Sequence, residues 1–143
     1  MGQDLLNRTL KIANETAQLQ AVRAFVTDVV RHSPVPPTLE NGILLAVDEA
    51  VANIIKHAYA EHRHDTIEIT LLVDAHRFQV TIRDSGVSFD PKSIADPDIQ
   101  EHVLQRRHSG LGVFLMRQIM DEVEYLFKEG VRNELRMVKY LDR

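Results

Sequence analysis

One segment constrains the fold more than any other: residues 38–59 carry apolar side chains at helical spacing along most of their length. The apolar positions cover a wide stripe, so we expect a helix that is deeply packed against other elements. The preceding run Ser33-Pro34-Val35-Pro36-Pro37 must separate it from any earlier helix, because proline lacks an N–H and disfavours a helical residue before it. The stripe consists of Leu39, Ile43, Leu44, Val47, Val51, Ile54 and Ile55.

The rest of the chain supplies the elements against which this helix can pack. Residues 8–14 alternate apolar and polar side chains and predict a strand, and residues 17–32 are amphipathic at helical spacing. Further along, the patterns predict strands at 66–74 and 77–84 in a hairpin, a helix at 111–121, and a second hairpin of strands 122–128 and 134–142. This order predicts an α+β two-layer sandwich, in which helices cover one face of a mixed, mostly antiparallel sheet.

Composition limits the function classes. The chain has 143 residues, 44% of them apolar and 27% charged, so we expect a single domain over 1–143. Cysteine is absent, which excludes disulfides and thiolate metal sites. The net charge of −4 gives no general attraction to nucleic acid or anionic lipid. No run approaches the ~18 apolar residues of a membrane helix, and the start shows no secretory pattern, so we expect a cytoplasmic protein.

Polar residues interrupt the apolar stripe of residues 38–59 toward its C-terminal end. Glu49 and Asn53 are four residues apart and share one face of the helix, with Lys56 and His57 one turn further on. Polar side chains on a packed helix must face solvent or a cavity, because burying them without partners is costly. From the helix alone, a solvated face remains the alternative to a ligand site.

Two further segments bear polar or glycine-rich patterns. Asp84-Ser85-Gly86 ends a predicted strand, which suits either a turn or a carboxylate that accepts a hydrogen bond from a ligand amine. His108-Ser109-Gly110-Leu111-Gly112 leads into a predicted helix, whose free N–H groups could hold a phosphate. The glycine-containing segment 108–112 is neither a Walker A loop nor a Rossmann fingerprint. The segment between them, 85–110, is too long for an ordinary connection.

Taken together, the three patterns resemble the motifs of the Bergerat-fold ATPases, the GHKL superfamily. The run from Asp48 to Tyr59, with Glu49, Asn53 and His57 followed by Ala-Tyr, resembles its N box. Asp84-Ser85-Gly86 with Phe89-Asp90-Pro91 resembles the G1 box, and Gly110-Leu111-Gly112-Val113-Phe114 resembles the G2 box. Within the superfamily, the chain is most similar to the anti-sigma factor serine/threonine kinases, over roughly residues 8–141.

The resemblance implies a role for each matching residue. Glu49 would be the general base, or would orient the attacking hydroxyl, and Asn53 would ligate Mg²⁺ beside ATP or ADP. Asp84 would accept from the adenine amine, and residues 92–109 would form the ATP lid, with Arg106 at its end. The remaining nucleotide-binding residues would be Gly86, Ser88, Gly110, Leu111, Gly112, Val113 and Phe114. Lys56, His57, Arg107, His108 and Asn133 are further candidates.

Two positions depart from the family pattern. Ser88 stands where the G1 box usually has a second glycine, and serine adopts a positive φ less readily. Asn133 stands near the place where the family usually has a threonine that supports the adenine site.

The function that the resemblance implies is an ATP-dependent protein serine/threonine kinase that is also an anti-sigma factor. It would bind a sigma factor or phosphorylate a STAS-domain anti-anti-sigma protein in a partner-switching cycle, and no nucleic-acid or membrane partner is expected. A homodimer is expected by analogy, with the first strand and helix as candidate surfaces. The alternatives are a nucleotide-binding partner-switch module with little or no kinase activity, and a detached histidine-kinase catalytic domain.

Overall fold

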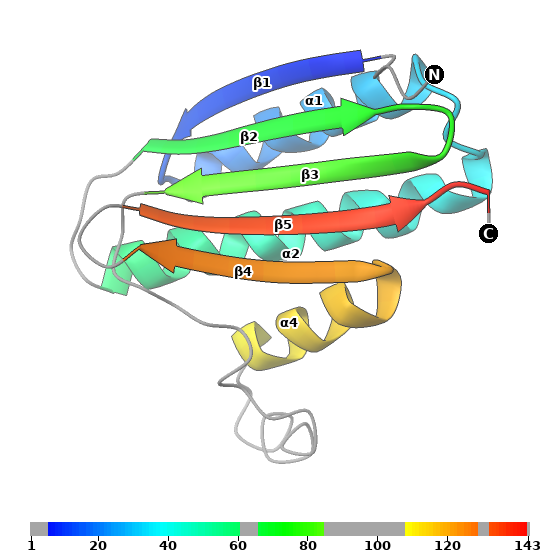
Figure 1. The fold of residues 1–143 in the computed structure, drawn as a ribbon. Coiled ribbons are helices and arrows are strands. Elements are labelled where there is room, and N and C mark those ends of the chain that lie inside the picture. Colours follow the sequence, from blue (N-terminus) through cyan, green and yellow to red (C-terminus); the bar gives the residue numbers. More distant parts are fainter. Residues whose placement is uncertain (1–5, 61–65, 85–107, 129–131, 143) are drawn as a thin grey trace.

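The computed structural model describes residues 6–60, 66–84, 108–128 and 132–142. Their five strands form one sheet in the order β1-β2-β3-β5-β4, and every neighbouring pair is antiparallel. Strand β1 is therefore one edge of the sheet and β4 the other (Figure 1). The strands are β1 (Leu6–Ala13), β2 (Thr66–Val73), β3 (Arg77–Asp84), β4 (Glu122–Lys128) and β5 (Arg132–Tyr140).

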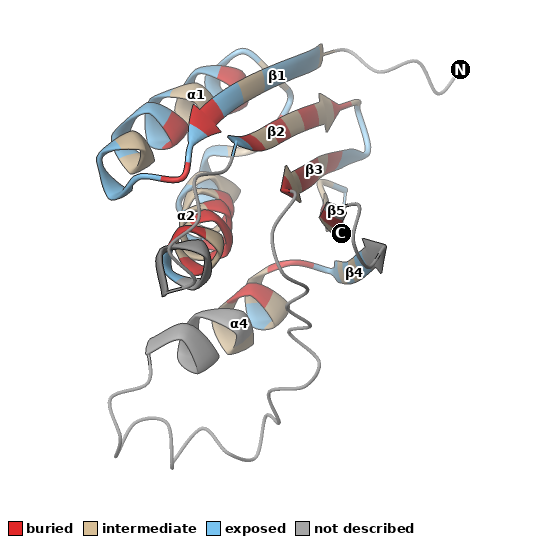
Figure 2. Cartoon of the chain, turned by 90° about the vertical axis from the view of Figure 1, so that its left-hand side faces the viewer, coloured by how far each residue is buried: buried red, intermediate tan, exposed pale blue. Residues whose placement is uncertain are grey.

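The helices lie on one face of this sheet and make the second layer (Figure 2). A 3-10 turn, η1 (Thr16–Gln18), leads into α1 (Leu19–Arg31), and α2 (Pro37–Ala60) crosses behind the sheet next to it. The last helix, α4 (His108–Ile119), packs on the other side of α2. The predicted α+β two-layer class is confirmed, and the described strands pair in antiparallel fashion throughout.

The core fills the space between the two layers. Along β2 the buried residues alternate with half-buried ones, so one face of the strand meets the helices and the other faces away from them. The apolar stripe predicted for residues 38–59 supplies the opposing surface, with α2 residues less than 2% exposed along its length. These fully buried residues of α2 are Ile43, Ala46, Val47, Ala50 and Val51. Gly42 lets α4 approach closely, because a Cβ there would stand 3.2 Å from Cγ2 of Ile119.

Most element boundaries differ from the sequence prediction by one to three residues, and two of these differences matter for the site. Helix α4 begins at His108 instead of residue 111, so Gly110 and Gly112 lie inside the helix. Their low helix propensity favours a later start, and packing of α4 against α2 overrides that preference. Strand β5 begins at Arg132 instead of residue 134, which places Asn133 within the strand and opposite Asp84.

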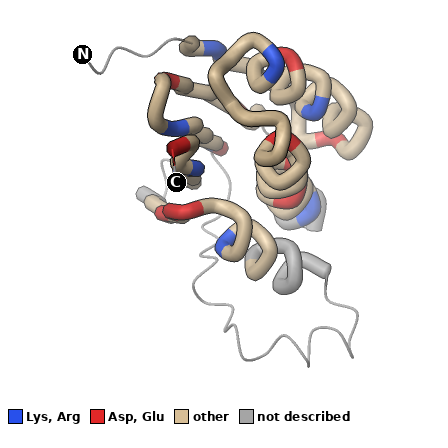
Figure 3. Tube along the Cα trace, turned by 90° about the vertical axis from the view of Figure 1, so that its right-hand side faces the viewer, with Lys and Arg blue, Asp and Glu red and all other residues tan. Residues whose placement is uncertain are grey.

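Charged residues of both signs are interspersed over the helical layer (Figure 3). Two ion pairs join α1 to α2: Arg23 Nε lies 2.8 Å from Asp48 Oδ1, and Arg31 Nε lies 3.2 Å from Glu40 Oε1. Among the helices that the structure describes, none is long and apolar enough to cross a membrane.

Candidate functional site

Three buried polar residues gather at one end of the molecule. The C-terminal end of β3, the start of β5 and the C-terminal half of α2 all lie at this end (Figure 1). Asp84 closes β3, Asn133 stands near the start of β5, and Asn53 lies in the second half of α2. Their exposed fractions are 8%, 3% and 7%, respectively. Polar side chains this deeply buried in an otherwise apolar core need hydrogen-bonding partners, which makes these three candidates for a ligand site.

Asp84 and Asn133 face the helical layer as a directly opposed pair. Along β3 and β5, the register pairs Val80 with Met137, Ile82 with Leu135 and Asp84 with Asn133. These alternate positions lie on one face, so the last pair continues the line of the core. Asn133 Nδ2 donates a hydrogen bond of 3.2 Å to Asp84 Oδ1. Two polar residues thus replace the apolar pair that the pattern would otherwise place between the layers.

Glu49 and Asn53 share one face of α2, as their spacing predicts. Glu49 is half-buried and Asn53 is buried, so the line between them runs from the accessible side of the helix into the interior. Glu49 is therefore reachable from solvent, while Asn53 lies in the interior.

Asp48, the residue before Glu49, fixes this part of α2 to α1. Arg23 donates to both oxygens of its carboxylate, from Nε at 2.8 Å and from Nη2 at 3.2 Å. This hydrogen bond, with the attraction of the carboxylate, raises the pKa of Arg23. A bidentate guanidinium–carboxylate pair has a defined geometry, so it restrains the rotation of α2 about its axis beside Glu49.

The N-terminal turn of α4 supplies backbone donors. An α-helix leaves the N–H groups of its first residues without intrahelical acceptors and carries a partial positive charge at that end. Because α4 begins at His108, these donors lie in its first turn, which includes Gly110 and Leu111 of the predicted phosphate-binding segment 110–114.

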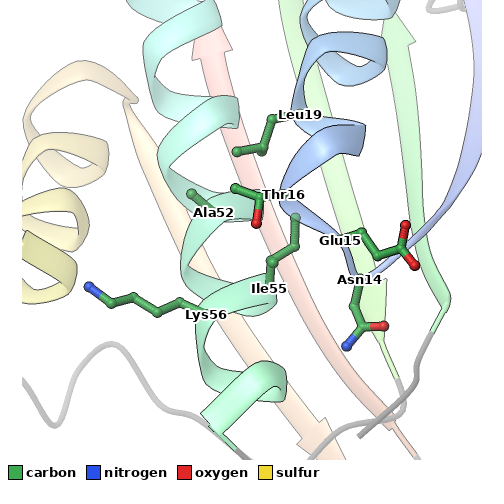
Figure 4. Close-up of a pocket in the computed structure, with 7 residues that line it drawn as sticks. All are labelled: Asn14, Glu15, Thr16, Leu19, Ala52, Ile55 and Lys56. Atoms are coloured by element: carbon green, nitrogen blue, oxygen red, sulfur yellow. The ribbon is translucent and has the colours of Figure 1, made fainter. Parts of the chain in front are cut away.

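Lys56 borders a cavity of about 440 Å³ between α2 and the start of α1 (Figure 4). Its exposed side chain extends away from Leu19 and Thr16, which line the same cavity (Figure 4). Among the described lining residues, Ala52 and Lys56 lie on α2 close to Asn53 in the chain, and none is one of the three buried polar residues. The lining residues are Asn14, Glu15, Thr16, Leu19, Ala52, Ile55 and Lys56.

Several predicted site residues lie outside the described part of the chain. This holds for Gly86, Ser88, Arg106 and Arg107, and for most of the lid predicted at 92–109. For His57, and for His108, Gly110, Leu111, Gly112 and Val113 in α4, the structure describes the backbone but not the side chain. Phe114 is half-buried in the second turn of α4.

The described residues fit a purine nucleotide with Mg²⁺. A carboxylate and two carboxamides line the interior, and Asp84 already accepts one hydrogen bond, which is how a buried carboxylate is tolerated. Over the described ranges, no group of three or more His, Cys, Asp or Glu residues could hold a metal by itself. Magnesium is commonly held by one or two protein oxygens together with phosphates and water, which is what the Asn53 amide oxygen could supply.

Sequence reasoning missed the charged residues on the opposite face of the sheet, behind the buried pair. Arg83 and Glu134 adjoin Asp84 and Asn133 in the chain, and their side chains meet at 2.8 Å on the uncovered face. The alternation of residues 77–84 already predicts that Arg83 faces away from the core. Its pairing with Glu134 required the register of β3 with β5, which single-sequence periodicity does not give.

This fold defines a class: an α+β sandwich with buried polar side chains between its sheet and its helical layer. The model of one family, the histidine kinase-like ATPase domain, matches residues 12–139. The chain belongs to this family. The match confirms the resemblance to the Bergerat-fold ATPases that the three motifs predict.

Curated relatives agree with the kinase branch of that resemblance. The chain is 33% identical over 102 residues to the serine-protein kinase RsbW of Listeria monocytogenes, a match that covers 68% of this chain and 64% of that protein. It is 33% identical over 105 residues to RsbW of Bacillus cereus, with 69% and 62% covered. The chain therefore spans slightly less than two thirds of the length of these relatives.

Solved structures show the same fold at low sequence identity. The SiaB–SiaC complex of Pseudomonas aeruginosa contains a chain that matches with a TM-score of 0.64 at 16% identity, covering 94% of this chain and 89% of that one. The RsbU and RsbW domains of a Mycobacterium tuberculosis protein match with a TM-score of 0.62 at 15% identity, covering 95% and 33%.

Proposed function

We propose that this protein is an ATP- and Mg²⁺-dependent serine/threonine protein kinase and an anti-sigma factor, which phosphorylates a STAS-domain anti-anti-sigma partner. The observation that carries the proposal is the placement of half-buried Glu49 one helical turn from buried Asn53. Membership of the ATPase family and similarity to proteins named serine-protein kinases support ATP as the substrate and a hydroxyl as the acceptor.

Each residue of the site has a separate role in the phosphoryl transfer. Asp84 accepts from the adenine amine, the N–H groups at the start of α4 hold phosphate oxygens, and Asn53 supplies an oxygen ligand to Mg²⁺. The metal, when bound, neutralises charge on the phosphates. Glu49 accepts the proton of a partner serine or threonine as its oxygen bonds to the γ-phosphorus, and the bond to ADP breaks.

The partner-switching cycle follows from the chemistry of the product. A phosphorylated partner carries about two negative charges more than the free hydroxyl, which alters its contacts with this protein and releases it. This protein, no longer bound to its partner, then binds a sigma factor. We propose a homodimer formed by β1 and α1: β1 is an edge strand with exposed side chains at residues 7–9. Sedimentation of wild type against Thr9→Pro tests this, because proline disfavours pairing along an edge strand.

A pull-down followed by transfer tests the activity. The tagged protein is incubated with a lysate and ADP, the captured STAS-domain protein is purified, and both are mixed with labelled ATP and Mg²⁺. Label on a serine or threonine of the partner is the expected result. Binding of ATP and of the partner without transfer favours the partner-switch module instead, an alternative that Ser88 in the G1 box supports.

A further inference from the structure

A cluster of charged side chains joins three strands on the uncovered face of the sheet. Arg83 in β3 donates from Nε to Glu134 Oε1 in β5 at 2.8 Å, and from Nη1 to Glu68 Oε1 in β2 at 3.1 Å. We call these three residues the Arg83 clamp. Arg83 is 29% exposed and Glu134 15%, so the ion pair between them is partly withdrawn from solvent and is screened less than a surface pair.

The Arg83 clamp stands directly behind the buried pair of the candidate nucleotide site. In the register of β3 with β5, Arg83 opposes Glu134, and the next positions, Asp84 and Asn133, oppose each other. Successive residues of a strand point to opposite faces. The ion pair therefore lies on one face of the sheet, and the hydrogen bond between Asn133 and Asp84 lies on the other, one residue along both strands.

The side chain that faces the nucleotide site at this point therefore depends on the register between β3 and β5. A slip of one residue moves every side chain of a strand to the opposite face. At this end of β3, such a slip would replace the carboxylate of Asp84 with the guanidinium of Arg83 between the layers. A donor would then stand where an acceptor for an amine is needed. The buried residues Phe78, Val80 and Ile82 oppose a slip of the whole strand. At the end of β3, the ion pairs of Arg83 with carboxylates on both neighbouring strands hold the position of Asp84.

We propose that Arg83 is a positioning residue for base recognition, which acts through the sheet by holding Asp84 against Asn133. The proposal rests on the proposed function, since it assigns the adenine amine to Asp84. Arg83 does not touch the base. It fixes the orientation of the one carboxylate that does, and so determines the preference for adenine over guanine.

The test compares Arg83→Met with Arg77→Met. Arg77 is a matched control, because it lies on the same strand and the same face and pairs with Asp74 at the far end of β3. Dissociation constants for ATP and GTP are measured by calorimetry at a temperature where circular dichroism shows each variant folded. We expect Arg83→Met to lower the GTP-to-ATP ratio of dissociation constants on the order of tenfold, and Arg77→Met to leave it unchanged. Arg83→Lys should restore part of the ratio.

A ligand-free measurement separates positioning from stability. The side-chain amide of Asn133 gives its own ¹H–¹⁵N signals, and loss of the hydrogen bond to Asp84 should shift or broaden them in Arg83→Met but not in Arg77→Met. Where Arg83→Met does not fold, Glu134→Gln removes the ion pair while keeping the shape of the side chain.

The outcomes distinguish this proposal from the proposed function. Wild type that binds neither ATP nor ADP overturns the proposed function and the role in base recognition with it. Wild type that binds ATP, with an unchanged ratio and unchanged Asn133 signals in the clamp variants, overturns only the role of Arg83. A lower melting temperature without a change in ratio gives Arg83 a structural role alone and also overturns the proposal.

Discussion

Asn133 Nδ2 donates a hydrogen bond of 3.2 Å to Oδ1 of Asp84, across the β3–β5 pair and on the face that meets the helices. Both residues are buried: Asn133 is 3% exposed and Asp84 is 8% exposed. The proposed function assigns the carboxylate of Asp84 to a ligand N–H, which adenine presents at this position and the carbonyl of guanine does not.

Asp84→Asn should weaken the preference for adenine. The variant keeps the shape of the side chain but gives it a donor amide, which tolerates the guanine carbonyl, and mismatched buried polar groups otherwise discriminate strongly. Competition of ATP and GTP against a fluorescent adenine nucleotide measures this, and we expect the ratio of their affinities to fall on the order of tenfold or more. Asp28→Asn, an exposed carboxylate on α1, is the control. Equal competition by GTP in wild type would remove Asp84 from this role.

Asn53→Ala should remove the Mg²⁺-dependent part of nucleotide affinity. The amide oxygen is the protein ligand we assign to the metal, and loss of about 1.4 kcal/mol of interaction is a tenfold change in affinity. Calorimetry with ADP, with and without Mg²⁺, separates the metal-dependent part from the rest. Asn14→Ala is a matched control, because Asn14 is also a buried asparagine, 8% exposed against 7% for Asn53. Asn14 differs in that it lines the cavity beside α1. The metal assignment is wrong if Mg²⁺ raises the ADP affinity of the two variants equally.

The sequence predicts the layers better than it predicts the site. Helix 38–59 and strand 77–84 carry periodic patterns long enough to identify, and the structure has them as Pro37–Ala60 and Arg77–Asp84. The pair of Asp84 with Asn133 depends instead on cross-strand register, which joins residues 49 positions apart and has no local signal. The sequence predicts that the last strand begins at residue 134, which leaves Asn133 just before it, and pairing with β3 extends the strand over Asn133.

Local propensity also misplaces the start of α4. Glycine costs about 1 kcal/mol relative to alanine inside a helix, so Gly110 favours a start after it, at residue 111. The helix gains its stability by packing on α2, and this tertiary contact cannot be predicted from the local sequence. The Glu49–Asn53 spacing, by contrast, needs no tertiary information, and the helix that it presumes is present.

Asp74→Asn should reduce stability at neutral pH more than at acid pH. The backbone N–H of His76, 2.8 Å from Oδ1, lowers the pKa of Asp74 below its ordinary 3.8, and the N–H of Arg77 at 2.9 Å adds to this. A carboxyl whose pKa is lowered by folding stabilises the protein above its unfolded pKa, and this contribution is lost as pH falls through the folded pKa. The unfolding free energies of wild type and variant in urea should therefore differ most above about pH 5 and converge as pH falls through the lowered pKa of Asp74. A difference that is independent of pH would contradict the assignment to charge.

Glu49→Gln should separate catalysis from binding. Nucleotide affinity rests on Asn53, Asp84 and the start of α4, so the variant should bind ATP and the STAS-domain partner as wild type does. Glutamine cannot accept the hydroxyl proton, and loss of a general base costs roughly 10²-fold or more in rate. Single-turnover transfer of labelled phosphate to the partner measures the rate, and Glu40→Gln is the control, since Glu40 lies on the same helix and pairs with Arg31 near its start. Unchanged transfer in Glu49→Gln would make Glu49 a solvated helix residue. A fall in transfer that is matched by a fall in ATP affinity would instead place Glu49 among the binding groups.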